Sequence, residues 1–420
     1  MSEWKEYKLG EISIDVSYGY TESANENPVG PKFLRITDIR EGSIIWDKVP
    51  YCVINEREHV KNKLEIGDIV VARTGATTGI TETIKHNVDA VFASYLIRFR
   101  INKSLANPFY VGHVLKSHFW KDYVSSIVGG SAQPGANARQ FSGFSIKLPD
   151  LPTQTAIAEI LSSLDDKIEL NNKINQELET LAQTLFKQWF IDFEFPNENG
   201  EPYKSSGGEM VESALGEIPK GWNMKTLDDI SNITIGRTPP RKEHQWFSTD
   251  VNDVKWISIR DMGNCGTYIH TTSEFLTEEA VSRFNVPVIN SNTVIISFKL
   301  TVGRISITTE RMLSNEAIAH LNLKNKEIYP EFLYLFLKQF NFDSLGSTSS
   351  IATAVNSKSI KSLPFINPSK EVLSKFNEVI VPLFSRIHNL TFENKELVDL
   401  RDTLLPKLIS GELEINEINN

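Results

Sequence analysis

One short segment of the chain combines side chains that suit contacts with nucleic acid. It runs from Arg73 to Gly79 behind a stretch of β-branched residues, and it holds one arginine, three threonines and two glycines. Arginine and threonine donate hydrogen bonds to phosphates and base edges, and glycine lets a backbone approach a ligand closely. An ordinary hairpin turn would favour the same residue types. The candidate contacts in this segment are Arg73, Thr74, Gly75, Thr77 and Thr78.

A second segment, residues 129–139, is small, polar and rich in glycine. Its glutamine and asparagine match the hydrogen-bonding edge of adenine in the major groove, and its arginine matches guanine. A solvated linker is the alternative interpretation of such a composition. The candidate contacts here are Ser131, Gln133, Asn137 and Arg139.

The sequence lacks the complete motifs of several enzyme classes. Residues 73–79 are similar to a phosphate-binding loop but lack its lysine. There is no His-Glu-x-x-His zinc motif and no Gly-x-Ser-x-Gly nucleophile turn with plausible partners, and the eight histidines are scattered. The two cysteines, Cys52 and Cys265, exclude a disulfide framework and a cysteine-built zinc site. We therefore expect a non-catalytic chain with no metal site and no cofactor of its own.

The string Asn-Pro-Phe-Tyr at residues 107–110 resembles the Asn-Pro-Pro-Tyr loop of amino methyltransferases. The second proline is missing, however, and no glycine-rich cofactor loop precedes the string. Asparagine followed by proline is also a strong helix start, with Asn107 as the N-cap and Pro108 as the first helical residue. We therefore expect a helix from Pro108 to about Tyr123 instead of a catalytic loop.

The chain repeats itself at an offset of about 219 residues. The string from Trp4 to Ser13 is similar to that from Trp222 to Ser231, and Pro149 matches Pro368. The matches follow one another in the same order, and the period is far longer than the ~20–50 residues of a solenoid repeat. The sequence thus predicts two copies of one large unit, each a mixed α/β block followed by a long helix.

The duplication supplies a second set of candidate contacts. Lys299, Thr301 and Arg304 take the place of the first segment, and the stretch 346–356 takes the place of the second. One threonine and three arginines in the early part of the two copies, near strings that match between the copies, add four more candidate contacts. These two additional groups are Ser347, Thr348, Ser349 and Asn356, and Thr37, Arg40, Arg237 and Arg260.

Short β-branched runs predict strands, and two long segments without glycine predict helices. Pro382 lies within the second of these helices and either kinks it or marks its start. The fold class that follows is mixed α+β. The expected strands are 67–73, 90–101, 253–259 and 293–298, and the expected long helices are 153–193 and the stretch from 369 onwards.

Apolar residues at intervals of three and four form a seam along each long helix. Each seam needs a partner, so we expect the helices to pack antiparallel as a coiled-coil-like spacer about 60 Å long. Asn175 and Asn394 interrupt the seams at equivalent positions, either as buried residues that fix the register or as solvated ones. The apolar seam residues include Ile157, Leu161, Leu164, Ile168, Leu178, Leu383, Ile387 and Leu397, and Leu181 and Leu400 continue the same spacing.

The net charge of −9 is distributed unevenly. Residues 1–150 carry +1 and residues 219–367 carry +2, whereas residues 151–218 carry −9 and residues 368–420 carry −3. A nearly neutral block can hold a basic groove, while acidic helices suit contact with protein better than contact with phosphate. No apolar run reaches the ~18 residues of a membrane span and the N-terminus has no signal-peptide core, so we expect a cytoplasmic protein without membrane contact.

Several strings resemble the specificity subunits of type I restriction–modification systems. Leu148 to Ile157 is similar to the start of that family's central helix, and Leu185 to Phe193 is similar to its end. Gly216 to Trp222 resembles the beginning of the second half, Gly236 to Pro239 the opening of a target-recognition domain, and Leu400 to Gly411 the end of the C-terminal helix.

The resemblance implies target-recognition domains at 1–150 and 219–367, conserved helices at 151–195 and 368–412, and a linker at 196–218. It implies that each domain reads one half of a split site in double-stranded DNA and that the helix pair sets the spacing. It also implies two methyltransferase subunits and two motor-nuclease subunits as partners. These partners would hold S-adenosylmethionine, ATP and magnesium, and this chain would scaffold them.

The chain departs from the family pattern in places. Asp150 and Thr153 stand where proline and glutamate are usual, and residues 363–370 keep the helix-start pattern poorly. Two alternatives stay open. One is the recognition module of another restriction–methylation system. The other is a duplicated protein-interaction scaffold without a DNA role, which the net charge of −9 favours.

Overall fold

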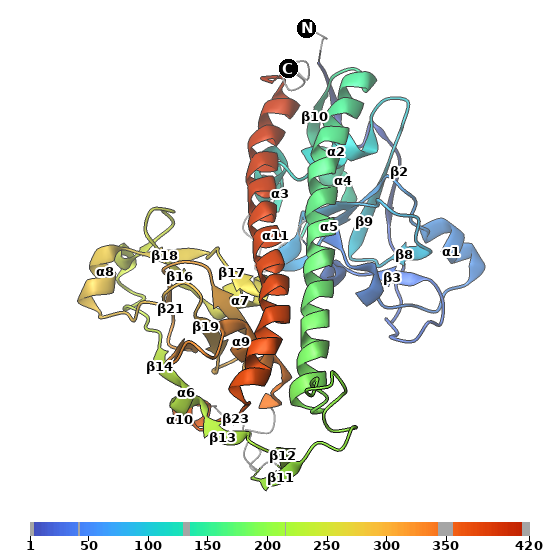
Figure 1. Ribbon diagram of the computed structural model, residues 1–420. Helices are drawn as coiled ribbons and strands as arrows, with labels where there is room; N and C mark the ends of the chain where they lie inside the picture. The colour runs from blue at the N-terminus through green and yellow to red at the C-terminus, as the bar shows by residue number, and fades with distance from the viewer. Residues whose placement is uncertain (1–3, 41–42, 129–134, 215, 343–355, 414–420) are drawn as a thin grey trace. The chain divides into compact units, whose positions relative to one another are not determined.

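A computed structural model describes residues 4–40, 43–128, 135–214, 216–342 and 356–413. Their contacts divide the chain into two units. Unit 1 contains the described residues up to Asn171 together with those from Glu393 onwards, and unit 2 contains Asn172–Phe392. Each of the two long helices in Figure 1 is therefore shared, because it begins in one unit and ends in the other.

A four-stranded antiparallel sheet forms the centre of unit 1. The two middle strands are almost wholly buried, as their content of isoleucine, valine, leucine and phenylalanine predicts. In spatial order the strands are β2 (Ser13–Tyr18), β9 (Leu96–Ile101), β6 (Asp68–Ala72) and β7 (Thr81–Thr83).

The same strand order recurs in unit 2, where a fifth strand joins in parallel at one edge. This sheet runs β14 (Ser231–Ile235), β22 (Ile318–Leu323), β19 (Val294–Ser297), β20 (Ile305–Thr308) and β17 (Tyr268–Ile269). Two smaller pairings recur as well. The antiparallel pair β1 (Lys5–Lys8) and β10 (Ser145–Leu148) matches β13 (Asn223–Thr226) and β23 (Pro364–Asn367). The parallel pair β3 (Lys32–Leu34) and β8 (Ala90–Phe92) matches β16 (Val254–Ile257) and β21 (Leu313–Ser314). This repetition confirms the predicted tandem duplication of a mixed α/β block.

Short helices and strands complete both units. In unit 1 they are β4 (Ile39–Arg40), β5 (Ser43–Ile44), α1 (Glu56–Asn62), α2 (Pro108–Val114), α3 (His118–Val128), α4 (Ala138–Ser142) and the 3-10 turns η1 (Ile36–Asp38), η2 (Trp46–Lys48) and η3 (Gly75–Thr77). In unit 2 they are β11 (Met210–Ser213), β12 (Gly216–Pro219), α6 (Leu227–Ile230), η4 (His244–Trp246), β15 (Phe247–Ser248), α7 (Ile259–Asn264), β18 (Glu274–Leu276), α8 (Glu278–Arg283), α9 (Pro330–Gln339) and α10 (Ser357–Lys361).

Local capping explains where several elements begin and end. Helix α2 starts as predicted, because the Asn107 side chain accepts hydrogen bonds from the backbone N–H groups of Phe109 and Tyr110. The prediction that this helix continues to about Tyr123 is wrong, since α2 ends at Val114 and a separate helix, α3, begins at His118. The expected strand 253–259 is shorter, since Ser258 already caps α7 with its side chain. The expected single strand 90–101 is two strands, because a turn before Leu96 divides it into β8 and β9.

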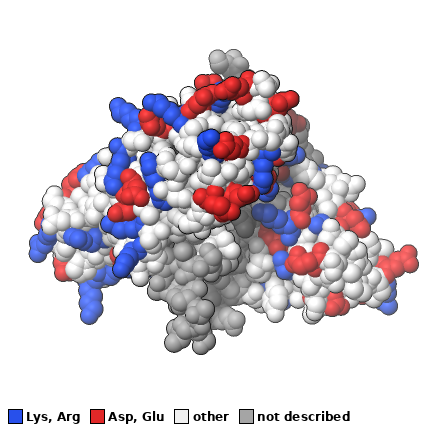
Figure 2. Space-filling model, turned by 60° about the horizontal axis from the view of Figure 1, so that its bottom comes forward, with Lys and Arg blue, Asp and Glu red and all other residues white. Residues whose placement is uncertain are grey.

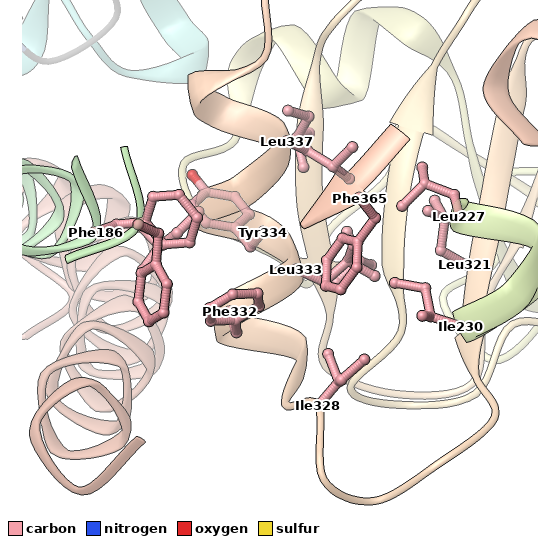
Figure 3. Close-up of a cluster of buried hydrophobic side chains, with 14 of the residues drawn as sticks. Phe186, Leu227, Ile230, Leu321, Ile328, Phe332, Leu333, Tyr334, Leu337 and Phe365 are labelled. Atoms are coloured by element: carbon pink, nitrogen blue, oxygen red, sulfur yellow. The ribbon is translucent and has the colours of Figure 1, made fainter. Parts of the chain in front are cut away.

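The core of unit 2 gathers around α9. Figure 3 shows Phe332 and Tyr334 of this helix on the side of Phe186 from the first long helix, and it shows Leu227 and Ile230 of α6 on the other side. The rings of Phe186 and Phe332 have centroids 5.2 Å apart. Unit 1 has a corresponding core in which α2 and the sheet pack against the start of one long helix and the end of the other.

The two long helices are α5 (Leu151–Phe190) and α11 (Lys370–Ser410). In unit 1 the first half of α5 lies along the last part of α11, and in unit 2 the second half of α5 lies along the first part of α11 (Figure 1). The pair is therefore antiparallel, as predicted. Helix α11 starts upstream of Pro382 and continues through it, so this proline does not mark the helix start. Among the described residues, no helix has the length and apolar character that crossing a bilayer requires.

The structure refines which seam residues are buried. Ile157, Leu161 and Ile387 are fully buried. The other apolar seam residues are only half-buried, and Leu181 and Leu400 on the same helices are each 46% exposed. The half-buried group comprises Leu164, Ile168, Leu178, Leu383 and Leu397.

The polar interruption of the seam is centred on a residue that the sequence did not single out. Asn171 is 0% exposed, and its Nδ2 donates to Asn394 Oδ1 at 2.9 Å and to Glu393 Oε2 at 3.0 Å. Asn175 instead donates to Thr391 Oγ1 at 3.4 Å. The two predicted asparagines thus belong to different units and bind different partners, and both are half-buried instead of solvated.

Candidate nucleic-acid interface

The candidate contacts of unit 1 gather at one edge of its sheet. In an antiparallel sheet the end of one strand lies beside the start of its neighbour. At this edge β2 ends in Tyr18, β6 ends just before Arg73, and β9 begins just after Tyr95. The Arg73 backbone N–H donates to the Tyr95 carbonyl at 3.0 Å, which fixes the loop to the sheet.

The loop after β6 is held in a defined turn. Residues 75–77 form a 3-10 turn, and the Thr78 hydroxyl donates to the Gly75 carbonyl at 2.7 Å. Trp120 Nε1 donates to the Gly79 carbonyl at 2.7 Å. Gly79 has φ +88°, and a Cβ there would lie 2.6 Å from Val124 Cγ1, so the position requires glycine. The turn keeps Thr74 and Thr77 half-exposed beside Arg73.

The second predicted segment meets the first at this edge. The Ala136 N–H donates to the Arg73 carbonyl at 3.0 Å, and Thr74 and Gly135 form an isolated β-bridge. The Ala138 N–H donates to the Tyr18 hydroxyl at 3.0 Å. The Arg73 guanidinium lies over the Tyr18 ring at 4.9 Å. Two loops that are distant in sequence therefore present one combined surface.

The two repeated asparagines of the second segments have a structural task. Asn137 caps α4 by accepting a hydrogen bond from the Gln140 N–H, and Asn356 caps α10 by accepting one from the Ser359 N–H. A cap uses the side-chain carbonyl, which adenine recognition also needs. The capping bond holds this carbonyl oxygen against the helix start and so restricts how these two residues can reach a base, whereas the exposed Arg139 in α4 keeps its whole side chain.

The corresponding edge of unit 2 carries different side chains. The loop after β19 holds the exposed residues Lys299 and Thr301, and the loop after β14 holds the exposed Arg237. Arg237 Nη1 donates to the Phe284 carbonyl at 2.6 Å, and Arg304 Nη1 donates to the Ile259 carbonyl at 2.5 Å. Both arginines therefore brace loops, and each retains further donors for a ligand.

Glu316 adds a negative charge to the same edge of unit 2. The Thr238 hydroxyl donates to its carboxylate. Burial would raise the pKa of Glu316, but the bond from Thr238 and the cations Lys299 and Arg241 outweigh it and hold the pKa below its usual value. The unit 2 edge is thus of mixed charge. In the view of Figure 2, lysine and arginine likewise alternate with aspartate and glutamate over the described surface.

For the remaining predicted contacts within the described residues, the structure gives a position in the fold but no hydrogen bond to the loops described above. Thr37 is exposed in η1, Arg40 lies in β4, and Arg260 is exposed in the first turn of α7. Within the described ranges, no group of three histidine, cysteine or acidic residues is placed to hold a metal ion. Five predicted contacts lie outside the described residues, namely Ser131, Gln133, Ser347, Thr348 and Ser349.

Sequence analysis missed two aromatic residues at the unit 1 edge. Tyr18 is 41% exposed and Tyr95 is 59% exposed, and both lie next to the backbone of Arg73 or its side chain. Exposed tyrosine beside arginine is typical of surfaces that contact nucleic acid. The signal in the sequence was a tyrosine immediately before a strand start and another at a strand end, which is recognisable only once the strands are paired.

Comparison with known proteins places this geometry in a family. The chain matches the "Type I restriction modification DNA specificity domain" over residues 1–180 and again over 219–400. It is 28% identical to the HindI specificity subunit of Haemophilus influenzae, over 98% of this chain and 100% of that one. It is 29% identical to the MjaIX specificity subunit of Methanocaldococcus jannaschii, over 74% of this chain and 70% of that one.

A solved structure supports the fold. The S subunit of a type I restriction–modification system from M. genitalium has a TM-score of 0.52 against this chain at 17% sequence identity, covering 97% of this chain and 96% of that one. Catalysis and cofactor use in this family belong to partner subunits, and this chain repeats the family domain twice. The chain therefore belongs to the type I restriction modification DNA specificity family, as a non-catalytic specificity subunit.

Proposed function

We propose that this subunit reads a split site in double-stranded DNA, with the loop edge of each unit contacting one half. The observation that carries the proposal is the repetition of one sheet edge in both units with different side chains on it. Arginine, tyrosine and threonine dominate the edge of unit 1, and lysine, arginine and glutamate mark that of unit 2. Such a pair is suited to two different half-sites. The proposed reading domains are 1–150 and 219–367.

Arg73 is the central residue of the proposed unit 1 contact. Its Nε atom is buried and has no hydrogen-bond partner among the described residues. The guanidinium is placed by the Tyr18 ring and the backbone is fixed by Tyr95 and Ala136. A guanidinium positioned in this way can donate to a phosphate or a guanine edge with little loss of side-chain freedom on binding.

The two helices supply the spacing between the half-sites. Helices of 40 and 41 residues are each about 60 Å long, and one turn of DNA separates equivalent groove faces by ~34–36 Å. A wrong base pair costs ~1–3 kcal/mol, so one short half-site alone discriminates poorly. Tethering two readers on one rod raises the effective concentration of the second.

Partner subunits are proposed to dock on the helices in two copies. The pattern Glu-Leu-x-x-Leu-x-x-Thr-Leu occurs at residues 177–185 and again at 396–404. Its middle leucines, Leu181 and Leu400, are each 46% exposed although they lie on apolar faces. An exposed apolar residue repeated at equivalent positions suits two copies of one partner. We assign them to two methyltransferase subunits, with two motor-nuclease subunits joining for cleavage in the cytoplasm.

The partners would carry the chemistry. Adenine methylation needs S-adenosylmethionine, and motor-driven cleavage needs ATP and magnesium. These groups are proposed for the methyltransferase and motor-nuclease subunits, and this chain supplies the positions at which the subunits and the DNA meet.

Methylome sequencing tests the proposal. The gene is expressed with its neighbouring methyltransferase gene in a host that lacks DNA modification, and the methylated motif is determined. We expect a split motif with one methylated adenine in each half. The double variant Arg73→Ala, Thr77→Ala should abolish methylation while the complex still co-purifies. Arg57→Ala, on the exposed helix α1, is the matched control and should leave methylation intact. Loss of assembly in the double variant would instead support the protein scaffold.

A further inference from the structure

The loop between β19 and β20 has at its tip a large apolar side chain that packs against none of the described residues of unit 2. Leu300 is 96% exposed, more than any other large hydrophobic residue described. Its φ is +61°, in the left-handed region that favours glycine or asparagine. A leucine there loses the hydrophobic benefit of burial and adopts an unfavourable backbone conformation as well.

The loop is nevertheless braced from within. The Thr301 N–H donates to the Lys299 carbonyl at 2.8 Å, which closes a three-residue turn with Leu300 at its tip. The buried Ser297 donates its hydroxyl to the Thr301 carbonyl at 2.5 Å, and its own carbonyl accepts from the Gly303 N–H at 3.0 Å. Arg304 ties the loop to α7 through the Ile259 carbonyl. These bonds brace the loop on both sides of the tip, and Leu300 projects from unit 2 into solvent.

The surroundings of the tip are polar and carry exposed cations, with the Glu316 carboxylate near Lys299. Lys299 precedes the leucine and is exposed with its Nζ 5.6 Å from the centroid of the Phe298 ring, and Thr301 follows it. Arg260 is exposed on α7, to which the loop is tied. An exposed apolar side chain next to Lys299, in a loop tied to the helix that carries Arg260, fits the chemistry of a DNA duplex, in which phosphates surround a stack of apolar base faces.

We propose that Leu300 is an apolar wedge that enters the base stack within the half-site contacted by unit 2. The inference rests on the proposed function, since it requires that unit 2 binds DNA by this edge. Lys299 and Arg260 would neutralise the flanking phosphates while Leu300 separates two neighbouring base pairs. The unit 1 loop carries Ala76 and threonines at this place, so the wedge belongs to unit 2 alone.

The test uses the complex of this chain with its methyltransferase subunit and the duplex defined by methylome sequencing. The fluorescent adenine analogue 2-aminopurine replaces in turn each adenine in either strand of the unit 2 half-site and its flanking base pairs, because its emission rises when it is unstacked. We expect a rise at one step besides the methylated adenine. In Leu300→Ala that rise should disappear and binding should weaken about tenfold, the effect of one lost base contact.

Val251→Ala is the matched control. Val251 is 76% exposed and lies before the start of β16. The loop that carries Leu300 is tied to α7, which follows the end of β16, so Val251 is an exposed apolar residue away from the proposed contact. This variant should keep both the fluorescence rise and the affinity. The wedge is refuted if the wild-type complex methylates its split site but Leu300→Ala leaves every 2-aminopurine signal and the affinity unchanged within twofold. Failure of the wild-type complex to bind any defined duplex would instead refute the proposed function.

Discussion

The two units solve the same packing problem with opposite chemistry. In each, a short helix of the α/β block packs on the long helices. Unit 1 places His113 of α2, Asp165 of α5 and Arg401 of α11 at this contact. Counted from the start of each helix, the equivalent residues of unit 2 are Leu335, Phe384 and Ala182, each 0% exposed.

The contact in unit 1 is a buried polar network. Arg401 Nη1 donates to Asp165 Oδ1 at 2.8 Å, and His113 Nε2 lies 3.1 Å from the Ser162 hydroxyl. The side chains of His113 and Asp165 are 7% and 4% exposed. Burial would raise the pKa of Asp165, but Lys116, the hydrogen bond from Arg401 and the nearby His113 outweigh it and hold the pKa below its usual value.

The contact in unit 2 is aromatic. The Phe384 ring centroid lies 5.7 Å from that of Tyr334 and 6.4 Å from that of Tyr268, both in near-perpendicular arrangements. Such a cluster needs no charge partner, and its stability does not depend on ionisation. The comparison shows that the backbone arrangement does not require a particular chemistry at this contact. The chemistry decides how each unit responds to mutation and to pH.

The largest effect is expected from placing the charge of unit 1 into unit 2. Phe384→Asp removes a buried ring and leaves a carboxylate without the arginine that Asp165 has. We expect unit 2 to lose at least about 5 kcal/mol of stability, because the lost packing and the unpaired charge add up. Hydrogen-exchange mass spectrometry reports the two units separately. Equal protection of wild-type and variant unit 2 would show that the contact is not a tight core.

A somewhat smaller effect is expected from breaking the ion pair of unit 1. Arg401→Ala leaves both carboxylate oxygens of the buried Asp165 without a hydrogen bond from the described residues, at a cost of about 3–5 kcal/mol in unit 1. The triple variant His113→Leu, Asp165→Phe, Arg401→Ala copies the chemistry of unit 2. It should restore wild-type stability or exceed it, because well-packed apolar groups replace buried ions without a desolvation cost. A triple variant less stable than Arg401→Ala would contradict the equivalence of the two contacts.

Sequence predicted local features of this architecture better than these long-range contacts. Asn107 and Pro108 start α2 because a cap depends on neighbours in the chain. The bond between Asp165 and Arg401 joins residues 236 positions apart, and neither residue type indicates burial on its own. The seam residues were predicted from spacing, but Leu181 and Leu400 match that spacing too and are exposed, because periodicity alone does not show which apolar face meets the partner helix.

The same limit applies to the candidate interface. Residue type led to Arg73 and Lys299 at the loop edges, whereas Tyr18 and Tyr95 became visible only when β2, β6 and β9 were paired. Asn137 and Asn356 were predicted as base contacts because of their amide groups. Their capping bonds depend on the helices that follow them, which are too short to be recognised from periodicity.

Each unit contains a buried neutral histidine, so the stability of each unit should fall at acidic pH. The pKa of His113 is lowered to about 4, because burial and the cations Lys116, Lys85 and Arg401 together outweigh the opposing effect of Asp165. Unfolded histidine takes up its proton near pH 6.5. The stability contributed by neutral His113 is therefore complete above about pH 6.5 and declines as the pH falls towards 4, by about 3 kcal/mol in total.

A pair of histidine variants assigns this pH dependence to one unit or the other. Burial also lowers the pKa of His320 in unit 2 to about 4. His113→Gln should flatten the pH dependence of unit 1 between pH 6.5 and 4 and leave unit 2 unchanged, and His320→Gln should do the reverse. Urea unfolding at several pH values, followed by hydrogen exchange, measures both. The assignment is wrong if either variant flattens both units.

The smallest effect concerns a polar contact that only unit 2 has. Tyr334 donates its hydroxyl to Glu179 Oε1 at 2.7 Å, and Lys338 and Thr267 bind the same carboxylate at 3.2 Å each. Gln183 Nε2 also donates to Glu179 Oε1, at 3.1 Å. Tyr334→Phe therefore removes one of four partners, so unit 2 should lose about 2 kcal/mol, less than any change above. At the equivalent position of α2 stands Gly112, where a Cβ would lie 2.1 Å from Thr83 Oγ1. At this position the backbone of α2 in unit 1 lies directly against Thr83, whereas α9 in unit 2 makes a hydrogen bond. A loss of stability above about 4 kcal/mol in Tyr334→Phe would mean that the ring itself has shifted in the aromatic contact.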